Sequence, residues 1–264
     1  AAAGVRSKVP FAQLASLTGG GRDDVIPTEA SAVVGFPLSE LTRAREAVAE
    51  AERELISEFG RTDPHLQLRL EQPEHASDVA LSEESTERLL DLLLLLPLGA
   101  LRASPEAPGS VETSVGLARV RQEATGMLEV LVLARSSQSA ALEGLRDRID
   151  RLASRVVATA AWGASTPSWA PDRGSALLQA AQEAFRRVEG RTASVAVAHA
   201  GLEVAAIKEK IPDMDMVSYG PDVAGARAPG ECVKVDSVEK TWELTRRLLS
   251  HFAAGATVDV QIDL

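Results

Sequence analysis

The chain has 264 residues, of which 45% are hydrophobic, 25% charged and only 3% aromatic. This composition is typical of a globular protein and excludes collagen-like, low-complexity and wholly disordered chains. The 38 acidic residues outnumber the 28 basic ones, and the resulting net charge of −10 argues against nucleic acid or an anionic membrane surface as the partner.

The chain starts at Ala1 without an initiator methionine, and its first ten residues contain no apolar run long enough for a secretion signal or a membrane span. Two origins fit this start: a targeting peptide removed before Ala1, which makes an organelle plausible, or a chain trimmed at Ala1 for another reason, in which case we expect a cytoplasmic location. The single cysteine, Cys232, cannot form an internal disulfide, so we expect a reducing compartment in either case. One cysteine also excludes thiolate-rich zinc and iron–sulfur sites.

The first elements predict a β-hairpin followed by a helix. A strand-like run begins at Phe11, the glycine-rich residues 19–24 form a turn, and residues 25–36 have the pattern of a second strand. Ser39 is a suitable N-cap for a helix whose first turn is 39–43 and whose body is 44–59.

The following segments predict an antiparallel sheet covered by helices. The predicted elements are a half-buried strand at 65–70, a helix at 82–96, a loop at 99–109, a strand pair at 111–122 and 127–135, and an amphipathic helix at 139–157. We therefore expect residues 1–162 to form an α+β domain, an antiparallel sheet with helices on one face.

Proline and glycine in residues 163–174 predict a linker to a second domain at 175–264. The elements expected there are helices at 175–190, 202–210 and 237–253, and strands at 193–198, 214–219 and 257–264. Helices that alternate with strands indicate parallel pairing, so we expect a partial α/β domain with a short parallel sheet.

Several short motifs follow one another in an order that is itself informative. They are GG (19–20) before IPTEA (26–30), VETS (111–114), ARS (134–136), WAPD (169–172), HAGLE (199–203), PDMDMVSYGP (212–221) and DSVEK (236–240). In wording and order they resemble the aminoacyl-histidine dipeptidases, also called cytosolic non-specific dipeptidases, of the two-zinc metallopeptidase superfamily that includes the carnosinases. The resemblance implies a lid domain inserted into an α/β metal-binding domain.

The same resemblance implies that most of the metal site is missing. The family chain is nearly twice as long, and this sequence aligns with roughly its second half. The other half carries the family's His-x-Asp ligands, bridging Asp, Glu-Glu pair and lid histidine. The histidines here, at positions 65, 75, 199 and 251, have no metal-site spacing. We expect no bound metal and no other cofactor.

Arg227 stands where the resemblance implies a further metal ligand. The family has a histidine in a Gly-x-His-Ser-Pro context, and residues 225–229 here read GARAP. A guanidinium group has no lone pair to donate and stays positively charged, so it opposes cation binding. Other departures from the family pattern are Asp24 and Gly116 in place of asparagines, and Val204-Ala205 in place of Cys-Gly.

Three residues are candidate remnants of a substrate site. Arg135 aligns with a lid arginine that resembles a clamp for the substrate carboxylate, and His199 and Glu203 lie where the family faces its substrate. Each also has a structural explanation. Arg135 suits a salt bridge at a strand end, Glu203 favours a helix N-terminus, and His199 fits a hydrogen-bonded turn.

Other chemically suggestive residues have simpler explanations. Asp23 and Asp24 are typical of a solvated glycine-rich turn, and the glycines before them lack the continuation of a phosphate loop. Ser114 and Ser218 lack a nucleophile elbow, and alternation places Ser218 within a strand. We therefore predict no nucleophilic catalysis.

Two functions from different classes follow. The first is a catalytically inactive, peptidase-derived structural or interaction subunit of a larger assembly, in which other protein subunits cover the incomplete domain; a homo-oligomer is compatible with it. Residues 92–96 and 257–264 are its candidate contact segments. The second is the C-terminal portion of a split or processed metal-dependent Xaa-His dipeptidase. A metal-free peptide binder that uses Arg135, His199 and Glu203 is a third, weaker alternative.

Overall fold

The computed structural model describes residues 8–9, 12–73, 79–105, 107, 109–123, 126–165, 167, 169, 172, 174–196, 203–226 and 230–255. The chain divides into two compact units. Unit 1 comprises Ala1–Gly99, Val115–Ala134 and Gly144–Trp162, and unit 2 comprises Ala100–Ser114, Arg135–Glu143 and Gly163–Leu264. The domain limits expected from the sequence, 1–162 and 175–264, stay a prediction.

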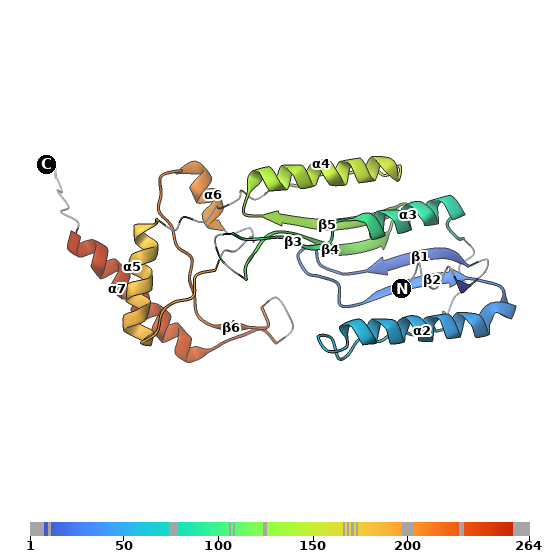
Figure 1. Cartoon of the computed structure of the whole chain (residues 1–264), viewed down its shortest axis with the longest axis horizontal. Helices are drawn as coiled ribbons and strands as arrows, with labels where there is room; N and C mark the ends of the chain where they lie inside the picture. Colours follow the sequence, from blue (N-terminus) through green and yellow to red (C-terminus); the bar gives the residue numbers. More distant parts are fainter. Residues whose placement is uncertain are drawn as a thin grey trace. The chain divides into compact units, whose positions relative to one another are not determined.

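The main sheet has five strands (Figure 1). They are β1 (Gln13–Gly19), β2 (Ala30–Gly35), β3 (Gly99–Ala103), β4 (Val111–Gln122) and β5 (Leu128–Ser136). Their order is β2-β1-β4-β3, and β5 also pairs with β4. β1 and β2 are antiparallel, from Gln13 opposite Gly35 to Gly19 opposite Ala30, which confirms the first predicted hairpin.

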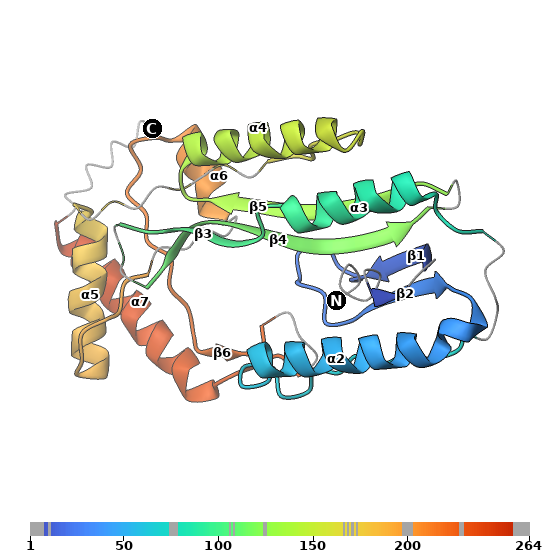
Figure 2. The same ribbon diagram turned by 45° about the vertical axis from the view of Figure 1, so that its right-hand side comes forward.

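Helices α3 (Glu83–Leu95) and α4 (Ser139–Arg155) lie side by side along the sheet in both ribbon views (Figures 1 and 2). Leu96, which follows α3, joins Leu145 and Ile149 of α4 in a buried cluster with Val115 of β4. Spacings of three and four residues place these side chains on one face of each helix, and burial of that face drives the packing. The two predicted helices are confirmed, and Ser82 caps α3 by accepting a hydrogen bond from the Ser85 backbone.

Helix α2 (Leu41–Phe59) follows a short 3-10 turn, η1 (Leu38–Glu40). Its Ala44 and Ala47 are buried, and these small side chains let the helix approach Phe36 and Leu70 closely. The helix is confirmed but its predicted cap is wrong. Ser39 lies within η1, and the residue before α2 is Glu40, which makes no capping bond.

Two strand predictions in unit 1 need correction. Residues 65–70 alternate between exposed and half-buried as expected but form no strand, because the Leu68 N–H donates to the Glu52 carboxylate of α2 at 3.1 Å instead of to a neighbouring strand. The second hairpin strand starts at Ala30, not at residue 25.

The predicted loop at 99–109 also begins differently. Residues 99–103 form β3, whose five residues are all exposed. An exposed edge strand of this kind carries no alternation of apolar and polar residues, so the sequence pattern did not reveal it.

Unit 2 contains α5 (Ala176–Glu189), α6 (Glu203–Lys210), α7 (Val235–Gly255) and a small antiparallel pair, β6 (Val223–Ala224) and β7 (Cys232–Val233). Ser175 caps α5 by accepting a hydrogen bond from Leu178 N at 2.8 Å, and Gly190 ends the helix with a φ of 71°. Helices α5 and α7 pack through Ala181, Ala184, Leu244 and Leu248. The three predicted helices are confirmed.

The described residues do not show the predicted parallel sheet. Residues 193–196 and 214–219 form no strand, and most of them are exposed. A strand in a parallel sheet needs a hydrogen-bonded neighbour and cover on both faces, and the described part of unit 2 supplies neither for these segments. Residues 197–198 and 257–264, also expected in strands, lie outside the described residues.

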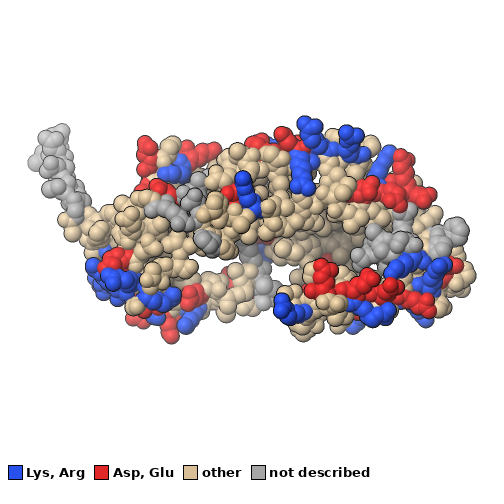
Figure 3. Space-filling view, viewed as in Figure 1, with Lys and Arg blue, Asp and Glu red and all other residues tan. Residues whose placement is uncertain are grey.

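The surface carries charges of both signs. On the face drawn in Figure 3, acidic and basic side chains are interspersed along α2 and α4. Among the described residues, none of the helices combines the length and the apolar character that crossing a bilayer requires.

Candidate functional site

Of the three predicted substrate residues, the structure describes the side chain of one. Arg135 lies near the end of β5, and Glu203 is the first residue of α6, with a side chain outside the described part. His199 also lies outside the described residues. Whether the three side chains converge therefore stays a prediction.

Beside Arg135 lies a buried polar cluster built from the VETS and ARS motifs. Glu112, Thr113, Ser136 and Ser137 are between 4% and 8% exposed. The Thr113 hydroxyl lies 3.4 Å from Glu112 Oε1 and 2.9 Å from the Ser136 hydroxyl. A backbone bond from Ser137 N to Glu112 O, at 3.1 Å, joins the two strand ends, and Gln138 N donates to Ser136 Oγ at 3.0 Å within the segment that follows β5.

Arg102 of β3 balances the charge of this cluster. Its Nη1 lies 3.2 Å from Glu112 Oε1, and its side chain is 63% exposed whereas that of Glu112 is 6% exposed. A buried carboxylate is tolerated only when it is paired and hydrogen-bonded, and Arg102 and Thr113 meet that need. The cluster therefore fastens β3, β4 and β5 to one another.

The cluster contains no activated nucleophile. The hydrogen bonds described for this cluster link Thr113 to Glu112 and to Ser136, and none of these partners is an imidazole base. Serine hydrolase chemistry therefore has no support at Ser136. Ser114 is half-buried in β4, and Ser218 lies in residues 214–219, which form no strand, so its predicted placement in a strand is wrong.

The side chain of Arg135 is half-buried, and no hydrogen bond or ion pair joins it to another described residue. The salt bridge that would explain it structurally is thus absent from the described part of the chain. A guanidinium in this state can pair with a carboxylate supplied from outside.

The PDMDMVSYGP motif is fixed to three helices of unit 2. Asp215 Oδ2 accepts a hydrogen bond from Leu177 N of α5 at 2.9 Å, Lys208 of α6 donates to Met214 O at 2.8 Å, and the Tyr219 hydroxyl lies 2.9 Å from Thr245 Oγ1 of α7. Hydrogen bonds from the Ser175 hydroxyl and then from the backbone N–H groups of Leu177 and Met216 hold the pKa of Asp215 below its ordinary value. Asp215 thus helps to cap the N-terminus of α5, and the three contacts attach residues 214–219 to α5, α6 and α7.

Within the described part of the chain, the residues do not fit a two-zinc centre. No group of three or more His, Cys, Asp or Glu side chains within the described ranges is placed to hold a metal ion. Arg227 lies outside those ranges, in the sequence between β6 and β7. Its guanidinium has no lone pair that could bind a metal ion, whatever its position.

The other titratable candidates belong to local structure. Asp24 pairs with Arg22 in the predicted turn, and Asp23 pairs with Arg119 of β4, so this acidic pair is a set of surface ion pairs. Cys232 is exposed in β7.

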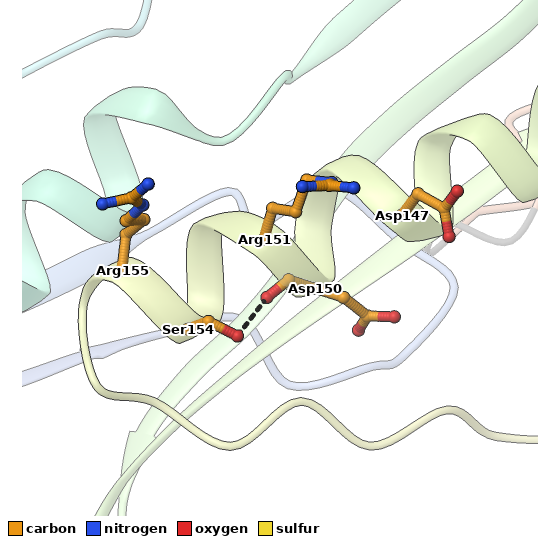
Figure 4. A pocket seen from close by; sticks show the side chains of 5 residues that line it. All are labelled: Asp147, Asp150, Arg151, Ser154 and Arg155. Atoms are coloured by element: carbon orange, nitrogen blue, oxygen red, sulfur yellow. Dashed lines mark hydrogen bonds between the residues drawn. The ribbon is translucent and has the colours of Figure 1, made fainter.

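A hollow on α4 is lined by Asp147, Asp150, Arg151, Ser154 and Arg155. Figure 4 shows Arg151 and Arg155 pointing to one side of the helix and Asp150 to the other. The Ser154 hydroxyl donates to the Asp150 carbonyl at 2.9 Å, within the helix itself. The hollow is a solvated helix surface without converging polar groups.

Sequence reasoning missed the role of Glu112, Thr113 and Ser136. The available signal was the polar run 112–114 at the start of β4 together with the polar run 135–137 at the end of its pairing partner, β5. Polar residues on both strands of a buried pair indicate a shared hydrogen-bond network.

Comparison with known proteins agrees with the resemblance to the dipeptidases that the motifs indicate. No protein-family model matches the chain. Over 243 residues, 92% of its length, the chain is 30% identical to the cytosol non-specific dipeptidase of Escherichia coli (strain K12), and the match spans 50% of that protein. The crystal structure of aminoacylhistidine dipeptidase from Vibrio alginolyticus superposes with a TM-score of 0.76 at 27% identity, covering 94% of this chain and 51% of that one. The chain thus spans about half the length of both relatives. It is a partial, dipeptidase-like relative of these enzymes.

Proposed function

We propose that the chain is a peptidase-derived structural or interaction subunit that does not hydrolyse peptides. The observation that carries this proposal is Arg227, which stands where the family resemblance implies a metal-binding histidine. An arginine at that position removes a ligand and adds a positive charge, and neither change depends on how much of the relatives the chain spans.

The surface of unit 2 supports a role in assembly. Trp242 and Leu249 are each 66% exposed, and Val223, Val233 and Ile211 are about half exposed. Large apolar side chains left open in this number favour contact with another polypeptide. Leu94 and Leu95, at 68% and 59% exposed in α3, support the same role for residues 92–96. The expected partners are protein subunits, and a homo-oligomer fits the same surface.

The test is hydrolysis by the purified chain and by its native assembly. An Xaa-His dipeptide is supplied with zinc, manganese or cobalt, with and without a chelator. The proposal predicts no chelator-sensitive turnover in either preparation and an assembly larger than the monomer in the native one. Chelator-sensitive turnover by the native assembly would contradict it.

The second candidate is the C-terminal portion of a two-zinc Xaa-His dipeptidase that works with a separate half. Its support is the half-length match together with Arg135, whose half-buried guanidinium has no described partner. This candidate predicts turnover once the complementary half and zinc are added, with a raised KM in Arg135→Ala. The first proposal predicts none.

A further inference from the structure

Three arginines line one side of helix α4. Arg148, Arg151 and Arg155 recur at spacings of three and four residues, which places them within about 60° of one another around the helix. Figure 4 shows Arg151 and Arg155 on one side of α4 and Asp150 on the other. We call Arg148, Arg151 and Arg155 the α4 arginine stripe.

The α4 arginine stripe is not neutralised within the described part of the chain. Its three residues are exposed, and no hydrogen bond or ion pair joins their side chains to another described residue. Arginines of other helices are paired at short spacings, Arg88 with Glu84 in α3 and Arg246 with Glu243 in α7. The stripe therefore presents three unpaired guanidinium groups in a row.

The Asp150 carboxylate, which precedes Arg151 in the sequence, is bonded on the other side of α4. Trp162 Nε1 donates a hydrogen bond to Asp150 Oδ1 at 2.8 Å, and Arg146 Cζ lies 4.9 Å from the centre of the indole ring. Figure 4 shows the chain turning after Arg155 and running back along α4. Because the indole holds Asp150 away from the stripe, the positive charge of the stripe is available to a partner.

A row of carboxylates is the chemistry that this surface fits. A guanidinium group pairs with a carboxylate through two parallel N–H···O bonds. The stripe spans about 10 Å along α4, from Arg148 to Arg155, so it can bind several carboxylates at once. A small anion would lie on an open helix surface, because the hollow beside the stripe has no converging polar groups.

Nucleic acid fits the stripe less well than an acidic polypeptide does. A phosphate backbone continues beyond the stripe in both directions, so it would lie over the rest of a chain whose net charge is −10. A short acidic segment can end where the stripe ends and avoids this repulsion.

The spacing within the stripe favours a helix as the partner. Arg148 and Arg151 are about 4.5 Å apart along the helix axis, and Arg151 and Arg155 are about 6 Å apart. An α-helix with acidic residues at alternating spacings of three and four residues repeats these distances. The side chains on one face of a strand recur only every 6.6 Å or about that distance.

We propose that the α4 arginine stripe binds an acidic α-helix of another protein, with one carboxylate opposite each arginine. The proposal rests on the proposed function only in that an interaction subunit needs a protein partner, and it involves neither Arg227 nor the apolar surface of unit 2. The three ion pairs are exposed to solvent, so each contributes little and the row binds as a set.

The test is fluorescence anisotropy of a labelled peptide titrated with the full chain. The peptide is alanine-rich, about 18 residues long so that it can form a helix, and carries glutamates at alternating spacings of three and four residues. Replacing all three stripe arginines by glutamine should weaken binding about tenfold or more, and each single replacement about threefold. Raising the salt to about 0.5 M should also weaken it.

The matched control removes the same charge elsewhere in unit 1. Arg45→Gln, Arg53→Gln and Arg61→Gln are combined in one variant, since all three arginines are exposed on α2 or just after it. This variant should bind the peptide like the original chain. Equal weakening in the control and stripe variants would overturn the proposal, because net charge alone would then explain the binding.

Three further results would also overturn the proposal. The first is equal binding of a peptide with the same composition whose glutamates are spread around the helix. The second is tighter binding of a single-stranded oligonucleotide than of the acidic peptide. The third is salt-sensitive self-association of the chain that the three stripe replacements abolish, since the partner would then be a second copy.

This proposal and the proposed function fail in different ways. Chelator-sensitive turnover of an Xaa-His dipeptide would overturn the non-hydrolytic function, while the dependence of peptide binding on the stripe would remain. An inactive chain whose peptide binding is unaffected by the three stripe replacements would overturn the docking and leave the function intact.

Discussion

Glu112 shows how a single buried carboxylate organises the β3, β4 and β5 strand ends. Its side chain is 6% exposed and bonds Arg102 and Thr113. We expect Glu112→Ala to lower the free energy of unfolding by about 2–3 kcal/mol, because it leaves a buried hydroxyl and a cation without their acceptor. Urea denaturation measures the change. The matched control is Glu84→Ala, since Glu84 forms a surface ion pair and its side chain is 73% exposed; equal losses in both variants would refute the role of Glu112.

Asp215 makes the stability of unit 2 depend on pH at the acidic end. The pKa of Asp215 is lowered in the folded chain, chiefly by the Ser175 hydroxyl. The carboxylate therefore stabilises the fold fully when the pH is above the pKa of an unfolded aspartate, which is about 4. This stabilisation is lost as the pH falls through the lower pKa of the folded state. We expect Asp215→Asn to be less stable than the original chain at pH 7, with the difference shrinking below about pH 4. Unfolding curves at several pH values test this, with Asp213→Asn as the neighbouring control; a difference that does not vary with pH would count against it.

At the scale of elements, the β1–β2 hairpin depends on close backbone approach at Gly20. This residue has a φ of +77°, and a Cβ atom there would lie 2.1 Å from the Ala118 carbonyl oxygen of β4. Gly20→Ala should therefore lower stability by about 2 kcal/mol or more, as a lower melting temperature shows. The adjacent Gly21 has open space around its Cβ position, so Gly21→Ala is the matched control and should melt like the original chain. Similar melting of both variants would disprove the tight contact.

The sequence predicted helices better than strands, for a physical reason. Helices α3, α4, α5 and α7 are defined by local spacing and by caps such as Ser82, Ser175 and Gly190, all readable within a few residues. Strands need partners. Residues 65–70 and 214–219 have the right composition but no strand beside them, whereas the exposed β3 has a partner and no pattern.

At the scale of the whole molecule, motif order was more informative than composition. The order of motifs such as HAGLE and PDMDMVSYGP resembles the dipeptidases, and the similarity to the Escherichia coli enzyme agrees with it, whereas composition alone indicates only a globular protein. The candidate site was only partly predictable. Arg135 could be found by resemblance, but the network of Glu112, Thr113 and Ser136 depends on two strands meeting, which no local pattern encodes.

The proposed lack of hydrolysis depends on Arg227, which we infer prevents this chain from completing a dipeptidase metal centre, and bound zinc is the property that this residue should change. The chain is joined at Ala1, through a flexible linker, to the half of the Escherichia coli cytosol non-specific dipeptidase that it does not match, and the fusion is dialysed against zinc. Bound zinc per chain is measured for the original sequence, for Arg227→His and for the control Arg61→His, an exposed arginine in unit 1. We predict that Arg227→His binds more zinc than the other two, because imidazole supplies the lone pair that guanidinium lacks. Equal, full zinc occupancy in all three proteins would show that Arg227 does not block zinc binding.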